Sequence, residues 1–235
     1  METSQQYLTD GGPLYAETDL HYIIVEPWNA VSSLAIVLPA VFWAIKLKFD
    51  YRKYPFLFFT IPLLILGGLG STFYHAFRAS TWLLFMDVAP TAILTFSVGV
   101  YFWLKVVPKW WQALLIIIPF TVLRFALFDR LPGENAVNIS YFITGFLIFF
   151  PVLLYLIRHR FRYYKSILIS VVMLSLSLVF REMDQRASEY IYMGTHFLWH
   201  LLSGVGAYFL GKYLFLLRKE ELATTKAVSY VQQRL

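Results

Sequence analysis

Five polar residues in otherwise apolar stretches have types and spacings that suit chemistry. His196 and His200 are four residues apart, so on a helix both imidazoles project from one face. His75 stands in a second apolar stretch, with Ser71 one helical turn before it, and Asp87 stands in a third. Ionisable side chains are costly inside a membrane span, so each of these positions is a candidate functional residue.

The three histidines have the composition of a metal site. A histidine pair at i and i+4 can bind one ion, as in the helical pairs of zinc hydrolases. His75 would complete a set of three imidazoles and leave the fourth position to water, which is typical of catalytic rather than structural zinc. The alternative is that the histidines pack or form hydrogen bonds with no ion between them. The presence of Asp87 and Ser71 near the same depth favours a zinc site over histidines that only pack.

The elements that must position these residues are membrane helices. The chain has 235 residues, of which 59% are hydrophobic and 14% are charged, and its mean hydropathy is +0.61. A soluble domain has about a quarter charged residues, so this composition predicts an all-α membrane protein. The basic excess is better explained by cytoplasmic loops than by nucleic-acid binding. The absence of cysteine excludes disulfide scaffolds and thiol catalysis.

Apolar runs bounded by charged residues predict seven transmembrane helices. A span needs about 20 mainly apolar residues, and only the sixth run is short for this purpose. The predicted spans cover residues 27–47, 54–77, 82–104, 110–128, 137–157, 166–180 and 190–217. A polar N-terminal segment, residues 1–25, precedes the spans and a tail, residues 218–235, follows them. We therefore expect a single seven-helix domain over residues 1–235.

The distribution of lysine and arginine predicts the direction of the chain across the membrane. Of the 20 such residues, the five on one side are Arg78, Arg124, Arg130, Arg181 and Arg186, and the rest lie on the other. The positive-inside rule then places the C-terminus in the cytoplasm and the N-terminus outside or in a lumen. At 1.5 Å per residue, all five polar candidates lie within about 15 Å of the outer face. The three spans thus bring them to one layer.

Four segments of the sequence are similar to segments of one known family. Residues 196–208 read HFLWHLLSGVGAY, residues 70–75 read GSTFYH, residues 86–90 read MDVAP and residues 26–33 read EPWNAVSS. They resemble the last helix, the Ser-x3-His element, the Asp-bearing third helix and the Glu-x-Trp-Asn-x-Val-Ser stretch of the alkaline ceramidases. The wider set is shared by the CREST superfamily of seven-transmembrane zinc hydrolases, which includes adiponectin-receptor relatives. The stretch at residues 26–33 and the predicted direction across the membrane favour the ceramidase branch.

This resemblance implies an intramembrane zinc hydrolase that cleaves the amide bond of a ceramide-like lipid and releases a fatty acid and a sphingoid-type amine. His75, His196 and His200 would hold the zinc ion that activates water. Asp87 would act as general base and later as acid, and Ser71 would stabilise the developing oxyanion. The implied partners are the bilayer and a membrane lipid substrate, with no nucleic acid and no obligate protein partner. The membrane would be a bacterial inner membrane or that of the ER or Golgi.

Two features depart from the pattern of that family. The residue after the Asp of the third helix is usually Glu in the ceramidases, and it is Val88 here. The N-terminal Asp-Trp-x-Glu-x-Asn motif, with which those enzymes bind calcium together with the span-one Glu, is not intact. The carboxylates of Glu17, Asp19 and Glu26 could still serve a hard cation. Calcium is therefore a second candidate cofactor, beside the alternative of a solvated acidic segment.

Other functions fit parts of the sequence. A receptor in which zinc only holds the helices together would bind the metal and release no fatty acid. A haem protein would use His75 and a histidine of the last span as axial ligands and would show a Soret band. A retinal protein lacks the mid-span lysine it needs, because Lys212 lies at the cytoplasmic end. A transporter fits less well, because the sequence has no clear inverted repeat.

Overall fold

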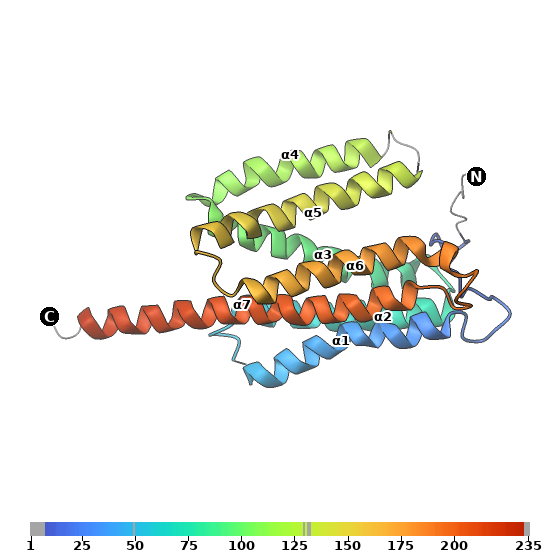
Figure 1. Ribbon diagram of the computed structural model, residues 1–235, viewed down its shortest axis with the longest axis horizontal. Coiled ribbons are helices and arrows are strands. Elements are labelled where there is room, and N and C mark those ends of the chain that lie inside the picture. The colour runs from blue at the N-terminus through green and yellow to red at the C-terminus, as the bar shows by residue number, and fades with distance from the viewer. Residues whose placement is uncertain (1–7, 49, 129, 131–132, 233–235) are drawn as a thin grey trace. The chain divides into compact units, whose positions relative to one another are not determined.

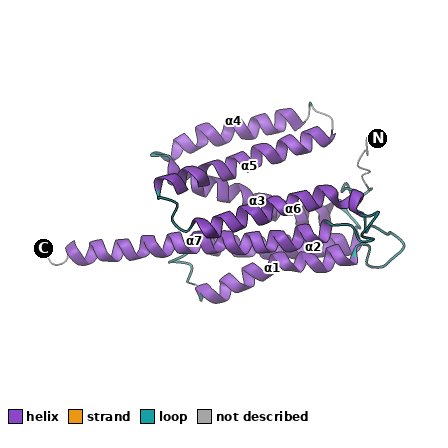
Figure 2. Ribbon diagram, in the orientation of Figure 1, coloured by secondary structure: helices purple, strands orange, loops and turns teal. Residues whose placement is uncertain are grey.

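A computed structural model describes residues 8–48, 50–128, 130 and 133–232 of the chain. In this part of the chain all regular secondary structure longer than a single bridge is helical (Figure 2). The helices, labelled in Figure 1, are α1 Pro27–Leu47, α2 Pro55–Phe77, α3 Thr81–Val106, α4 Trp110–Phe128, α5 Gly133–Arg158, α6 Tyr164–Ala187 and α7 His196–Gln232. The structure therefore confirms the all-α fold class with seven helices.

Six of the described helices are long and apolar enough to cross a membrane. In the remaining helix, α5, the described apolar stretch is the shorter Phe142–Arg158. Large apolar side chains stay exposed along the helices, for example Leu38 at 66% and Leu115 at 65%, as a surface in contact with lipid requires. The chain is thus an integral multi-pass membrane protein, as its composition indicates, while the direction of the termini stays a prediction.

The helix bounds agree closely with the predicted spans except at the sixth and seventh. Helix α6 continues to Ala187, well past the predicted end at residue 180, because charged residues end an apolar run without ending the helix. Helix α7 begins at His196 instead of residue 190, and Gly194 before it has a left-handed backbone with φ of 65°. His196 is therefore the first residue of its helix, and the preceding residues form a loop.

The described residues form two compact units. One unit runs from Ala92 to Arg162 and contains the later part of α3 together with α4 and α5, which run side by side (Figure 1). The other contains the chain up to Thr91 and again from Tyr163 onward, so it holds α1, α2, the beginning of α3, α6 and α7. All the candidate functional residues belong to this second unit.

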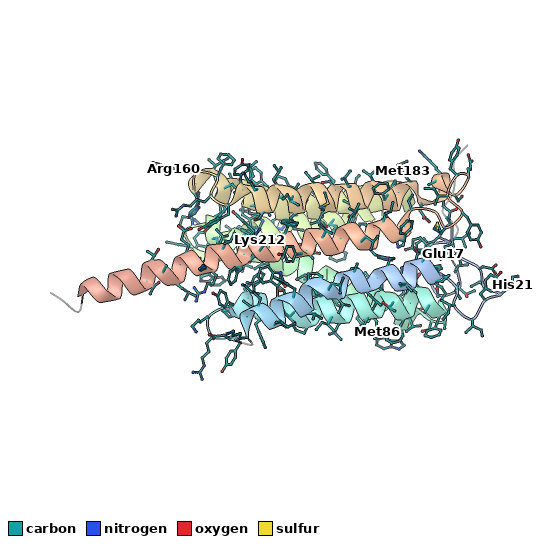
Figure 3. All side chains as sticks on the ribbon, turned by 60° about the horizontal axis from the view of Figure 1, so that its bottom comes forward. Glu17, His21, Met86, Arg160, Met183 and Lys212 are labelled. Carbon is teal, nitrogen blue, oxygen red and sulfur yellow. The ribbon has the colours of Figure 1, made fainter. Side chains whose placement is uncertain are left out.

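Glycines set the close helix contacts of the second unit, in which α1 packs against α2 and α7 (Figure 3). A methyl group at Gly204 would lie 2.3 Å from the carbonyl oxygen of Ala35, so only glycine lets α7 approach α1 this closely. A methyl group at Gly70 would lie 2.2 Å from the carbonyl oxygen of Met86. Small residues permit such close approach of membrane helices. The second contact places the neighbours Ser71 and Asp87 on adjoining helices.

Candidate metal centre

Three buried histidines come together in the second unit, as their spacing predicts. His75, His196 and His200 are 1%, 2% and 1% exposed. Each offers one ring nitrogen, and these atoms all lie within 4.8 Å of one another. Their ring centroids are 4.8 to 5.1 Å apart. Among the described residues, this is the one group of histidine and acidic side chains whose geometry could hold a metal ion.

Backbone contacts at the end of α2 fix the position of His75. This residue lies in the last turn of the helix, where carbonyl groups have no partner within the helix. The backbone N–H of Glu26 donates to the carbonyl of His75 at 3.1 Å, and that of Val25 donates to the carbonyl of Ala76 at 2.9 Å. The segment that leads into α1 therefore satisfies the end of α2 and places the Glu26 side chain beside His75.

An acidic side chain on α6 fixes the start of α7. The Asp184 Oδ1 atom accepts hydrogen bonds of 2.8 Å from the backbone N–H groups of Thr195 and His196. Its Oδ2 atom accepts another of 2.8 Å from Ala16 in the N-terminal segment. A carboxylate in this position caps the N-terminus of the helix, and its negative charge interacts favourably with the helix dipole. Asp184 is thus a positioning residue, and its local signal in the sequence is an acidic residue near the end of the sixth predicted span.

The hydrogen bonding of the histidines tests whether a metal ion fits. His75 shares a short hydrogen bond between its Nδ1 atom and Glu26, while its Nε2 atom is buried with no partner. The Nδ1 atom of His196 is also buried with no partner. His200 contacts Ser32 Oγ through Nδ1 at 2.9 Å. A carboxylate on one ring nitrogen with the other nitrogen free is the usual arrangement of a metal-binding histidine, so these residues fit such an ion.

Ser71 and Asp87 lie beside the cluster. Asp87 lies close enough to Ser71 and His75 for both to act on its carboxylate, and the Ser71 oxygen lies 3.5 Å from the Nε2 atom of His200. Ser33 Oγ is 3.0 Å from the same hydroxyl, which extends the polar chain to α1. The structure therefore brings all five residues that sequence analysis singled out into one layer. The residues of this layer come from α2, α3 and α7, and α1 contributes Ser32 and Ser33 beside them.

Tyr15, a residue of the N-terminal segment, covers the cluster. Its ring centroid is 4.0 Å from that of His196 and 5.2 Å from that of His75. Burial raises the pKa of the Tyr15 phenol well above its usual value, so the ring stays neutral at physiological pH. The sequence predicted a polar segment at residues 1–25 with candidate calcium ligands, and it did not predict this contact. Nothing in the local pattern distinguishes Tyr15 from its neighbours.

The proposed calcium ligands serve other contacts. Glu17 caps α1 by accepting hydrogen bonds of 2.6 and 2.9 Å from the backbone N–H groups of Trp28 and Asn29 (Figure 3). Burial raises the pKa of Glu17. Asp19 accepts a hydrogen bond from the backbone N–H of His21, and Glu26 is hydrogen-bonded to His75. In the described part of the chain these carboxylates form no ligand set of their own, so calcium stays a prediction without structural support.

Comparison of the chain with models of known protein families and with curated proteins gives no match. The fold and the site therefore define the class without a family assignment. The chain is a helical, multi-pass membrane protein with a buried three-histidine cluster that could hold a metal ion.

Proposed function

We propose that this protein is an intramembrane zinc-dependent hydrolase that cleaves an amide bond in a ceramide-like lipid. The products would be a fatty acid and a sphingoid-type amine. The observation that carries the proposal is the convergence of His75, His196 and His200, with Ser71 and Asp87 beside them. Three imidazoles beside a carboxylate that is not needed as a ligand are the donor set of a catalytic zinc site.

Hydrogen bonds set the tautomer of His75 and the orientation of His200 in a way that suits metal binding. Zinc bound by three neutral imidazoles supplies the Lewis acidity that activates water near neutral pH. The Glu26 carboxylate accepts a hydrogen bond from the Nδ1–H group of His75. This contact selects the tautomer of His75 that has a free lone pair on Nε2. Ser32 holds the ring of His200 from the other side of the cluster. The chain thus presents ligands whose orientation is set before any ion binds.

Asp87 and Ser71 have the positions that amide hydrolysis requires. Asp87 would take a proton from the attacking water while the water oxygen bonds to the acyl carbon. It would then give that proton to the leaving nitrogen as the C–N bond breaks. Ser71, between Asp87 and His200, would donate its hydroxyl hydrogen to the developing oxyanion. Each role uses a side chain that lies beside the histidine cluster.

The surface near Asp87 suits a substrate with hydrocarbon chains. Phe73 and Phe77 on α2 are each 46% exposed, and Phe85 on α3 is 57% exposed. All three lie within two turns of Ser71 or Asp87 along their helices, at the end of the second unit that holds the cluster. They form part of an apolar surface on α2 and α3 along which the hydrocarbon chains of a lipid could lie.

The test is zinc analysis of the purified protein combined with a panel of lipid amides. We expect bound zinc and release of fatty acid from at least one long-chain amide, with neither in a protein stripped by a chelator. Zinc without release of fatty acid from any lipid amide would favour the receptor. A Soret band with no zinc would favour the haem protein, and either result would overturn the proposal.

A further inference from the structure

Arg78 lies directly after α2, and the proposed mechanism does not use it. Its side chain is buried and forms two hydrogen bonds to the Asp10 carboxylate, from Nε at 2.7 Å and from Nη2 at 3.1 Å. Its Nη1 atom donates to Glu26 Oε1 at 2.5 Å. One guanidinium therefore joins two carboxylates, and one of these is the carboxylate that holds His75 by its other oxygen.

The same guanidinium holds the N-terminal segment at two further points. Its Nη2 atom donates to the carbonyl oxygen of Pro13 at 3.0 Å. Its central carbon lies 5.6 Å from the ring centroid of Tyr15 and 4.7 Å from that of Tyr74, within the range of cation–π attraction. Tyr15 in turn covers His196. Asp10, Pro13 and Tyr15 are thus all held to the end of α2 by one side chain.

The backbone of Arg78 also departs from the usual pattern of a helix end. Arg78 caps α2 in the left-handed conformation, with φ of 45° and ψ of 33°. Glycine is the usual residue there, because a side chain makes this conformation unfavourable. At this position the arginine side chain makes the contacts with Asp10, Glu26 and Pro13 that a glycine could not make.

We propose that Arg78 is a positioning residue that acts as a built-in cation for the histidine cluster. It fixes Glu26 against His75 and holds the N-terminal segment, with Tyr15, as a cover over the cluster. Its single positive charge offsets half of the negative charge of Asp10 and Glu26, which a bound cation would otherwise have to offset. The inference rests on the proposed function only for the identity of the metal. The contacts of Arg78 are independent of it.

The test replaces Arg78 by glycine, which suits the backbone and leaves a space for a free guanidinium ion. We expect Arg78→Gly to bind zinc with up to about 10-fold lower affinity in competition with a chelator. Loss of a direct partner of a metal ligand costs about 10- to 100-fold, and Arg78 acts through such a partner, Glu26. We also expect faster chymotrypsin cleavage after Tyr15, because the cover is released. Guanidinium chloride, below denaturing concentration, should restore both properties in Arg78→Gly and should change neither in the wild type.

Lys48→Gly is the matched control. Lys48 is also a basic residue that caps a helix in the left-handed conformation, with φ of 49° at the end of α1, and its side chain is exposed. We expect wild-type zinc affinity and cleavage from this variant. Asp10→Asn is a second test that leaves the backbone at residue 78 unchanged. It should speed cleavage after Tyr15, and guanidinium should not restore it.

Several results would overturn the proposal. Wild-type cleavage and zinc affinity in Arg78→Gly would show that the guanidinium positions neither the cover nor the cluster. Loss of both without rescue by guanidinium, together with wild-type behaviour of Asp10→Asn, would show a general loss of structure instead. Neither readout uses lipid hydrolysis. If the wild type held no zinc, the proposed function would fail while the cleavage experiment still tested Arg78.

Discussion

Replacing Glu26 by glutamine should weaken metal binding although no ligand is changed. In the wild type, the two carboxylate oxygens of Glu26 accept from different donors, His75 on one side and Arg78 on the other. Glutamine has one acceptor oxygen and one amide NH2 group. One of the two donors must therefore face another donor, whichever way the amide is turned.

Both orientations of the amide are unfavourable. If the NH2 group faces His75, the imidazole must move its proton to Nε2 in order to accept at Nδ1, and Nε2 then has no lone pair for the metal. If the NH2 group faces Arg78, a buried guanidinium loses one of its two carboxylate partners, which is costly in a buried site. The first orientation acts on the metal directly, and the second weakens the hold on residue 26.

The expected loss is about 10- to 100-fold in zinc affinity, or about 1.4 to 2.8 kcal/mol. Competition with a chromophoric chelator measures it, with protein in the same detergent for each variant. Glu189→Gln is the control, because Glu189 is an exposed glutamate in the loop that leads to α7. A zinc affinity of Glu26→Gln within about twofold of the wild type would refute the reasoning, since it would mean that the carboxylate does not select the tautomer of His75.

Four further predictions concern the site and its supports. Asp87→Asn should keep zinc and lower fatty-acid release by about 10²- to 10⁴-fold, because the amide cannot take the proton of water. Simultaneous loss of zinc, measured by elemental analysis, would make Asp87 a ligand instead. His200→Ala should remove the zinc altogether, since two neutral ligands make a poor site, and full occupancy in that variant would contradict the assignment. Gly70→Ala should destabilise the protein by about 1 to 3 kcal/mol in thermal unfolding, because its methyl group would lie 2.2 Å from a backbone oxygen of α3. Gly145→Ala, where the nearest atom is 3.7 Å away, should have little effect. Burial opposes ionisation of Asp10, but its hydrogen bonds with Arg78 and Gly12 and the charge of Arg78 lower its pKa below the usual 3.8. Its ionised form therefore stabilises the cover above that value, and pepsin cleavage of the N-terminal segment should accelerate only as the pH falls below 3.8. An onset well above that pH would contradict the assignment.

Local patterns in the sequence were sufficient for the helices and for half of the site. A membrane span must be apolar over about 20 residues, so the run from residue 27 to residue 47 shows both ends of α1 directly. The pairing of His196 and His200 follows from the helical repeat alone. Depth along the spans then placed His75, Ser71 and Asp87 in the same layer, although it could not show which faces of the helices meet.

Tertiary structure alone decided how the site is held. The start of α7 was misjudged because Asp184, far along α6, caps the first turn of α7 through backbone groups. Arg78 reached Asp10 across 68 positions of the chain, and Glu26 reached His75 across 49. Such contacts depend on which helix faces meet, and this is settled by packing at residues such as Gly70. No local period in the sequence records these pairings, because each partner satisfies its own helix equally well without the other.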